Sequence, residues 1–112
     1  MHITEDKRHY LKRLADTEKV IFQLQEKSNY LSEPERIALN RRIAQLTMDY
    51  LYNTIVLAQN YKHLEKNIKR LHDKGLFPLP DKKYTKKYPI FAKAINNKIT
   101  RKILFYTLLK LK

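Results

Sequence analysis

The amino-acid sequence predicts an all-α fold: a bundle of three main helices with a basic amphipathic C-terminal helical extension. The composition is the first reason, because 112 residues contain one glycine and four prolines, and the abundant Leu, Ile, Lys and Glu favour helix over turn-rich β structure. The second reason is spacing, since apolar residues recur every three or four positions along most of the chain. A chain of this length forms one domain with a modest core.

The first helix is expected to begin after Thr4, whose hydroxyl can accept a hydrogen bond from a free amide of the first turn. It is expected to end near residues 28–32. The apolar stripe of this helix is formed by Tyr10, Leu14, Thr17, Ile21 and Leu24. Because charged residues occupy the opposite side, the pattern predicts a helix with one buried side.

The second helix has a clear start and two apolar sides. Ser32 is expected to cap it, with Pro34 in the first turn and Glu35 as the partner of a capping box. One side carries Ile37, Ala44, Met48, Leu51 and Ile55, and the other carries Leu39, Ile43, Leu46, Tyr50 and Leu57. A helix with two apolar sides lies between neighbours. We therefore expect the first helix on one side of it and the third on the other.

A third helix is expected to begin near Asn60, and the sequence leaves open whether it simply continues the second. Its single apolar stripe is formed by Tyr61, Leu64, Ile68 and Leu71. The end is marked by Gly75, the only glycine of the chain. A glycine there can adopt the left-handed conformation just past the last turn, which lets Leu76 fold back on Leu71.

The segment after Gly75 is apolar where a linker would be polar, which suggests a hydrophobic clip. The clip residues are Leu76, Phe77 and Leu79, and Pro78 and Pro80 favour an extended backbone around them. We therefore divide the chain into a helical bundle, residues 1–75, and a C-terminal region, residues 76–112, that packs on the bundle or flanks it.

The C-terminal region is expected to contain an exposed loop over residues 81–87 and two helices. The shorter helix starts around Pro89, and the last one starts near Lys98. The last helix, about 14 residues and roughly 21 Å long, is too short to span about 30 Å of hydrocarbon.

The net charge of +13 is unevenly distributed along the chain. Residues 1–74 carry 14 Lys and Arg against 10 Asp and Glu, which is a balance of +4. Residues 75–112 carry 10 basic residues against one acid, Asp81, which is a balance of +9. This asymmetry suggests an anionic partner for the C-terminal region, either nucleic acid or the phosphates of a membrane surface.

The last helix combines basic residues with Leu, Ile, Phe and Tyr, which is typical of a helix lying in a membrane interface. The residues expected to meet an anionic surface are Lys82, Lys83, Lys86, Lys87, Lys98, Arg101, Lys102, Lys110 and Lys112. The apolar residues expected at the same interface are Tyr84, Tyr88, Ile99, Ile103, Leu104, Phe105 and Leu108. The pattern is imperfect, because Phe105 lies within the basic sector of the helix and Lys110 within the apolar one.

Two other interpretations of this helix stay open. Its apolar side can dock on the bundle or on a further domain, since buried and interfacial helices share this pattern. Alternatively, the lysines and interleaved tyrosines can bind nucleic acid by gripping phosphates and stacking bases. Against nucleic acid, the tail is too apolar for a groove-reading arm, and no helix-turn-helix spacing is present.

No motif for catalysis or for a cofactor is present. The chain has no cysteine, its four histidines lack the spacing of metal ligands, and a single glycine cannot form a phosphate-binding glycine loop. The amino-terminal residues lack the apolar core of a signal peptide. We expect no catalytic residue, no metal and no cofactor within this chain.

Two stretches carry a resemblance to a known family. "LSEPERIALNRRIAQLTMDYLYNTI" at residues 31–55 and "KGLFPLPDKKYTKKYPIFAKAINNK" at residues 74–98 resemble the C-terminal region of bacterial family 2 glycosyltransferases, most closely the Bacteroidetes type that builds cell-surface polysaccharides. Members of that family carry an N-terminal nucleotide-sugar-binding domain with a metal-holding aspartate motif. Neither is found here, so no catalytic residue is carried over.

The resemblance implies a non-catalytic accessory region that supports a catalytic domain of a longer polypeptide and places it at the inner membrane face. The expected location is therefore the cytoplasm, peripheral to the membrane. A small nucleic-acid-binding module and a structural protein-interaction domain are the alternatives.

Overall fold

The computed structural model describes residues 2–111, with the side chains of residue 9 and residues 11–110. The side chains of Thr4, Tyr10 and Lys112 lie outside that description. The described chain is all-helical, which confirms the predicted fold class. Its helices are α1 His2–Lys27, η1 Ser28–Tyr30, α2 Glu33–Asn53, η2 Thr54–Ala58, α3 Tyr61–Asp73, α4 Tyr88–Asn96 and α5 Lys98–Leu111, where η1 is a 3₁₀ turn and η2 a π-helical turn.

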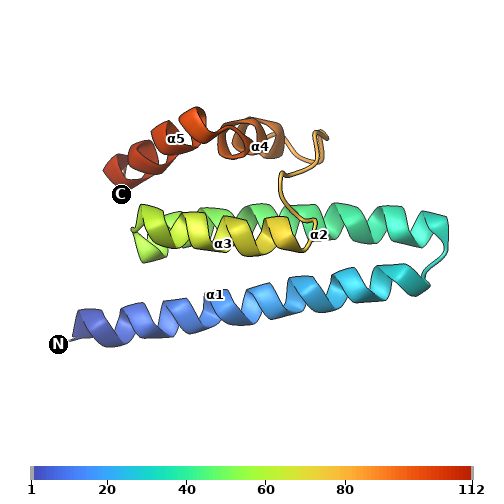
Figure 1. Cartoon of the computed structure of the whole chain (residues 1–112), viewed down its shortest axis with the longest axis horizontal. Coiled ribbons are helices and arrows are strands. Elements are labelled where there is room, and N and C mark those ends of the chain that lie inside the picture. Colours follow the sequence, from blue (N-terminus) through green and yellow to red (C-terminus); the bar gives the residue numbers. More distant parts are fainter. Residues whose placement is uncertain (1, 112) are drawn as a thin grey trace.

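The helices are arranged in layers (Figure 1). α1 and α2 form an antiparallel hairpin, α3 returns beside α2, and α4 and α5 lie on the side of α2 and α3 that faces away from α1. The molecule measures 49 × 28 × 24 Å. One core runs through all layers, because Phe77, Leu79, Tyr88 and Phe105 belong to the same buried cluster as Leu51.

α1 begins at His2 and not after Thr4 as predicted, whereas its end at Lys27 agrees with the sequence pattern. Leu14 and Ile21 of the predicted stripe are buried. The side of α1 that meets α2 therefore follows the apolar spacing.

The start of α2 differs in detail from a capping box. Ser32 is the N-cap residue and Pro34 lies in the first turn, as expected, but the Ser32 side chain accepts no hydrogen bond from an amide of that turn. Its Oγ instead donates to Oε1 of Glu35 over 2.6 Å. A hydrogen bond to a carboxylate is stronger than one between neutral groups. This explains why the two side chains bond to each other here, whereas in a capping box each side chain bonds to the other residue's backbone amide.

α2 and η2 occupy the centre of the molecule. Ile43 and Tyr50 are buried on one side, and Ala44, Leu51 and Ile55 on the other. η2 packs against α1, α3 and α5. Ile37 belongs to the same predicted stripe but is 65% exposed at the start of α2, so the stripe is buried only farther along the helix.

α3 is a separate helix, which decides the question left open by the sequence. Gln59 has a left-handed φ of 53° and ends η2. The Asn60 side chain then caps α3 by accepting a hydrogen bond from the His63 amide over 3.1 Å.

The end of α3 is the helix stop that the sequence predicts. Gly75 has φ +74°, its amide donates to the His72 carbonyl over 3.0 Å, and the Leu76 amide donates to the Leu71 carbonyl over 2.9 Å. These two bonds form the Schellman arrangement that satisfies the last carbonyls of a helix.

The clip is held by apolar packing and by one amide side chain. Phe77 and Leu79 are buried, and Leu76 packs against the same core. The Leu79 amide donates to Oδ1 of Asn96 over 2.8 Å, and Nδ2 of Asn96 donates to the Leu79 carbonyl over 2.9 Å. The last residue of α4 thus satisfies both backbone groups of Leu79.

Candidate functional site

The exposed side of α4 and α5 carries large apolar side chains. Ile90 is 76% exposed, Ile99 74%, Ile103 62% and Tyr106 56%. Lysines lie among them in the sequence and are exposed too. We call the outer face the set formed by Ile90, Lys93, Lys98, Ile99, Lys102, Ile103, Tyr106 and Lys110.

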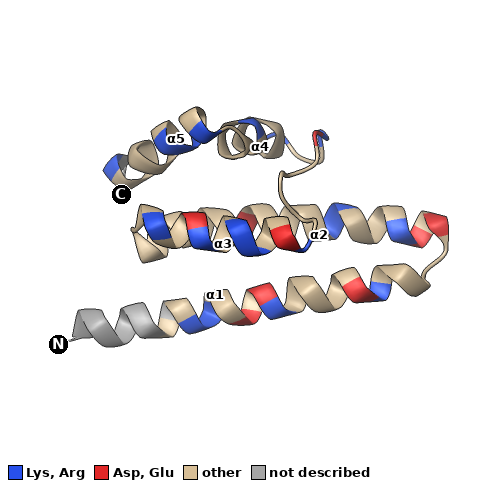
Figure 2. Ribbon diagram, in the orientation of Figure 1, with Lys and Arg blue, Asp and Glu red and all other residues tan. Residues whose placement is uncertain are grey.

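Acidic residues are missing from these two helices. Figure 2 shows Lys and Arg on α4 and α5 and neither Asp nor Glu, whereas both signs of charge alternate along α2 and α3. Asp81 is the last acid in the sequence. The outer face is therefore both apolar and purely basic, a combination that attracts an anionic surface with an apolar interior.

The loop before α4 extends the positive charge. Lys82, Lys83, Lys86 and Lys87 are all exposed, as expected. Tyr84 is half-buried between them. The Arg41 guanidinium lies 5.8 Å from the centre of its ring and donates from Nη2 to the Tyr84 carbonyl over 3.0 Å.

Tyr88 is not an interface residue, which corrects the prediction. It is fully buried, and its hydroxyl donates to the Pro80 carbonyl over 2.9 Å. Burial, with Tyr84 and Asp81 nearby, raises the pKa of Tyr88 to about 12. The physical reason is periodicity: Tyr88, Ala92 and Ile95 form the buried stripe of α4.

Phe105 is a second correction, because it is only 2% exposed. Its ring packs edge-on against Tyr61, with 5.3 Å between the ring centres. Leu104 and Leu108 are half-buried beside it. The predicted apolar arc is thus divided: Ile99 and Ile103 face outward, and the leucines border the core.

Arg101 is the third correction, since it is buried and does not belong to an exposed anionic-surface site. Its Nη1 pairs with Oε1 of Glu65 over 2.8 Å, and its Nε donates to the Ile95 carbonyl over 2.7 Å. The guanidinium also lies 5.2 Å from the ring centre of Phe77. We call Arg101, Glu65, Phe77 and the Ile95 carbonyl the clasp.

The clasp affects the ionisation of Glu65. Burial alone would raise the pKa of this carboxyl, but the hydrogen bond from Arg101 and the positive charge of Arg101 outweigh it. The pKa of Glu65 is therefore lowered, and the ion pair is intact at neutral pH.

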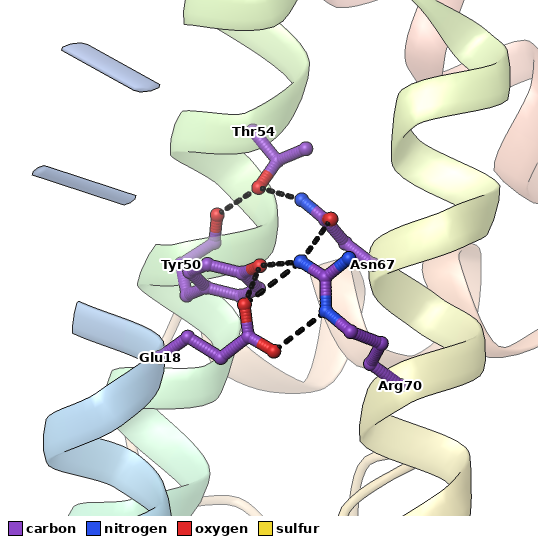
Figure 3. Close-up of polar contacts among 5 residues, drawn as sticks. All are labelled: Glu18, Tyr50, Thr54, Asn67 and Arg70. Carbon is purple, nitrogen blue, oxygen red and sulfur yellow. Dashed lines mark hydrogen bonds and ion pairs between the residues drawn. The ribbon is translucent and has the colours of Figure 1, made fainter. Parts of the chain in front are cut away.

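A second polar cluster, buried except for Arg70, lies between α1, α2, η2 and α3 (Figure 3). Arg70 binds Glu18 through two bonds, Nε to Oε1 over 2.7 Å and Nη2 to Oε2 over 2.8 Å. The Tyr50 hydroxyl donates to Oε2 of Glu18 over 3.0 Å. Asn67 accepts from Nη2 of Arg70 over 2.6 Å and donates to the Thr54 hydroxyl over 3.3 Å.

This cluster, the Glu18–Arg70 lock, is structural. Burial alone raises the pKa of Glu18, but hydrogen bonds from Arg70 and Tyr50 reverse the shift and lower it. Burial and the Glu18 carboxylate raise the pKa of Tyr50, so its hydroxyl stays a donor. The bonds drawn in Figure 3 run among these five residues, while the Arg70 side chain is still 52% exposed. A paired arginine and carboxylate here join three helices.

A hollow of about 630 Å³ lies between the end of α1, the start of α2 and the clip. Its walls include the neutral side chains of Gln25, Asn29, Asn40, Thr47 and Tyr84. The described residues contain no group of three or more His, Cys, Asp or Glu that could hold a metal ion. The walls of the hollow also include Glu26, Ser28 and Lys82, and the Ser28 hydroxyl donates to the Gln25 carbonyl over 2.7 Å.

Comparison with protein-family models, with curated proteins and with solved structures gave no match. Among the helices of the described chain, none has both the length and the apolar character needed to cross a bilayer. The outer face is consequently the candidate functional site with the most direct support from geometry.

Proposed function

We propose that this chain is a non-catalytic helical module that attaches to an anionic membrane surface through the outer face. The observation that carries the proposal is the exposure of Ile99 and Ile103, 74% and 62%, on a helix whose charged residues are all basic. Scattered apolar residues on a surface need no explanation. A helix side that is both apolar and basic does need an explanation, because water solvates its charged groups but not its apolar ones.

The expected energies fit reversible attachment. An exposed lysine near an anionic leaflet contributes about 1 kcal/mol, and the outer face carries four lysines. Burying an isoleucine side chain contributes roughly 1.5–3 kcal/mol, and Ile90, Ile99 and Ile103 are available. The loop lysines add to the electrostatic part only.

The wider role rests on the sequence resemblance. We propose that α1, α2 and α3 form a supporting bundle for the catalytic domain of a glycosyltransferase, and that α4 and α5 place it at the inner membrane face for polysaccharide synthesis. An open reading frame for a nucleotide-sugar-binding domain next to this one would support that role. If no such reading frame is present and no such protein co-purifies, the glycosyltransferase role is wrong, whereas the proposal of membrane attachment still stands.

Vesicle co-sedimentation tests the attachment. The parent should sediment with vesicles containing phosphatidylglycerol at low salt, less at high salt, and not with purely zwitterionic vesicles. Replacing both outward isoleucines, Ile99→Ser and Ile103→Ser, should lower binding about tenfold or more. The matched control is Ile37→Ser, because Ile37 is also exposed but lies at the start of α2.

The competing function gives a different result. In this case the parent fails to bind anionic vesicles and shifts a nucleic-acid probe with a steep salt dependence. The chain is then a nucleic-acid-binding module and the membrane proposal is wrong. If the isoleucine variants and the Ile37→Ser control bind vesicles equally, the isoleucines of the outer face do not enter the membrane and the proposed attachment through them is wrong.

A further inference from the structure

We propose that a hollow between α3, the clip and α5 binds a phosphate monoester that carries an apolar chain. The hollow has a volume of about 530 Å³, within the range of roughly 300–1,000 Å³ that small-molecule sites occupy. We call it the basic cleft, and its walls include Lys66, Ile68, Lys69, His72, Phe77 and Arg101. The cleft shares no residue with the outer face.

Three basic side chains of α3 line the cleft without an acidic partner. Lys69 and His72 follow Glu65 by four and seven positions, which places them on the same side of the helix. The ion pairs of the described residues are Glu18–Arg70 and Glu65–Arg101, so neither pair includes Lys66, Lys69 or His72. Unpaired cations around one hollow raise the local concentration of anions.

Arg101 adds donors to the wall of the cleft. It is only 6% exposed and yet lines the hollow. Its Nε donates to the Ile95 carbonyl and its Nη1 to Glu65, and Nη2 takes part in neither bond. A guanidinium has five N–H donors in a fixed fork that matches phosphate oxygens. The two donors on Nη2 can therefore bind an oxyanion without breaking the clasp.

The charge of the cleft favours a monoester. Glu65 also lines the hollow, and Arg101 neutralises its carboxylate, with 2.8 Å between the paired atoms. Lys66 and Lys69 then supply the excess positive charge, and the His72 ring can donate a hydrogen bond beside them. A phosphate monoester carries a charge of about −1.5 to −2 at neutral pH, which balances two lysines. A diester has a single negative charge and would leave part of the positive charge unmatched.

The remaining wall of the cleft is apolar, which favours an alkyl phosphate over the free ion. Ile68 and Phe77 both line the hollow. The Arg101 guanidinium lies 5.2 Å from the centre of the Phe77 ring, so the cationic and apolar parts of the wall adjoin. Inorganic phosphate would leave the apolar part facing water, whereas an alkyl chain would cover it.

Titration calorimetry with hexyl phosphate tests the ligand class. The parent should bind this soluble monoester with saturation at neutral pH and low salt. Inorganic phosphate, which lacks the chain, should bind about tenfold more weakly or less. Equal affinity for the two compounds would contradict the assigned ligand class, because the apolar wall would then contribute nothing.

Single substitutions test the place of binding. Lys69→Gln and His72→Gln should each weaken hexyl phosphate binding about tenfold, as loss of a hydrogen bond to a charged group does. Both residues are exposed, so circular dichroism should show an unchanged helical fold. The matched control is Lys19→Gln on α1, because α1 lies on the side of α2 and α3 that faces away from α5 (Figure 1). Equal affinities for these three variants would overturn the proposal.

Vesicles distinguish a membrane source of the phosphate from a soluble one. Phosphatidic acid has a monoester headgroup, and phosphatidylglycerol has a diester. Stronger binding to phosphatidic acid vesicles at matched surface charge, lost in His72→Gln, would identify a lipid as the ligand. Saturable binding of hexyl phosphate without that preference would identify a soluble alkyl phosphate.

The outcomes also separate the cleft from the outer face. Ile99→Ser with Ile103→Ser should keep the affinity for hexyl phosphate, even where it loses binding to phosphatidylglycerol vesicles. A parent that attaches to those vesicles but does not bind hexyl phosphate would overturn the basic cleft and leave membrane attachment standing. A parent that binds hexyl phosphate but not the vesicles would overturn the attachment and support the cleft.

Discussion

Two regions of this molecule join helices through an arginine–carboxylate pair, and the buried partner differs: it is the carboxylate of Glu18 in the first and the guanidinium of Arg101 in the second. In the Glu18–Arg70 lock the pair joins α1 to α3 with Tyr50 from α2, and apolar side chains around it point inward. In the clasp, Arg101 pairs with Glu65, and the isoleucines of the same helix point outward. The comparison teaches that either partner of an ion pair can be the buried one, and that removing its more exposed partner leaves a buried charge unpaired.

The charges of the helices also differ between the two regions. Figure 2 shows both signs of charge on α2 and α3, and only Lys and Arg on α4 and α5. Ile99 and Ile103 of α5 are exposed among these basic residues. We therefore place the proposed anionic partner at α5 and not at the lock.

The largest effect is expected from breaking the lock. Arg70→Leu would leave the carboxylate of Glu18, a residue 8% exposed, without its cation. Removing one partner of a buried pair costs about 3–5 kcal/mol. We expect a loss at the lower end of this range, because the Arg70 side chain is itself 52% exposed. Urea denaturation measures the free energy of unfolding, and Lys69→Leu on the same helix is the control, for which little change is expected.

Acid titration should sharpen the comparison. The folded-state pKa of Glu18 is lowered from 4.5, so the lock contributes its full stability above that pH and loses it as the pH falls through the lowered value. Glu18→Gln should therefore flatten the decline of the unfolding free energy in acid. The pKa of Glu65 is lowered as well, so the free energy of unfolding of Glu18→Gln should still decline somewhat in acid. A parent whose stability rises on acidification below pH 4.5 would contradict both assignments.

A smaller change in the free energy of unfolding is expected from substitutions at Gly75, where the bundle ends and the C-terminal region begins. Gly75→Val should lower the free energy of unfolding by about 1 kcal/mol or more, because a β-branched residue disfavours a positive φ. Nothing lies within 4 Å of a Cβ added there, so strain and not crowding is the cause. Gly75→Asn should lower the free energy of unfolding by less than Gly75→Val does, since asparagine tolerates a positive φ. Equal losses for both variants would make the helix stop unimportant.

The sequence predicted the parts of the fold that follow local rules. The stripe of α3, the left-handed Gly75 and the buried Phe77 and Leu79 all agree with spacing and turn chemistry. The start of α1 was placed too late.

The buried polar residues were missed because their role depends on partners distant in sequence. Glu18 lies four positions after Leu14 and three before Ile21, which puts it on the buried stripe. That spacing was the available signal. Nothing local, however, indicates that Arg70 meets it from α3.

The orientation of α5 could not be predicted for the same reason. Its helical wheel is apolar over more than half its circumference, so periodicity alone allows several rotations. The observed rotation places Phe105 against Tyr61 and Arg101 against Glu65, and these α3 residues lie 44 and 36 positions earlier in the chain. Tyr88 and Phe105 were misplaced for a simpler reason: neighbouring lysines were taken as a sign of exposure.

The most direct test of the central claim uses a single fluorophore, because the chain has no native tryptophan. Ile103→Trp places an indole on the outer face, and Ile37→Trp places one at the start of α2. With phosphatidylglycerol vesicles, the account predicts a blue shift and protection from aqueous quencher for Ile103→Trp and no change for Ile37→Trp. An unchanged spectrum for Ile103→Trp, or equal shifts at the two positions, would contradict attachment through the outer face.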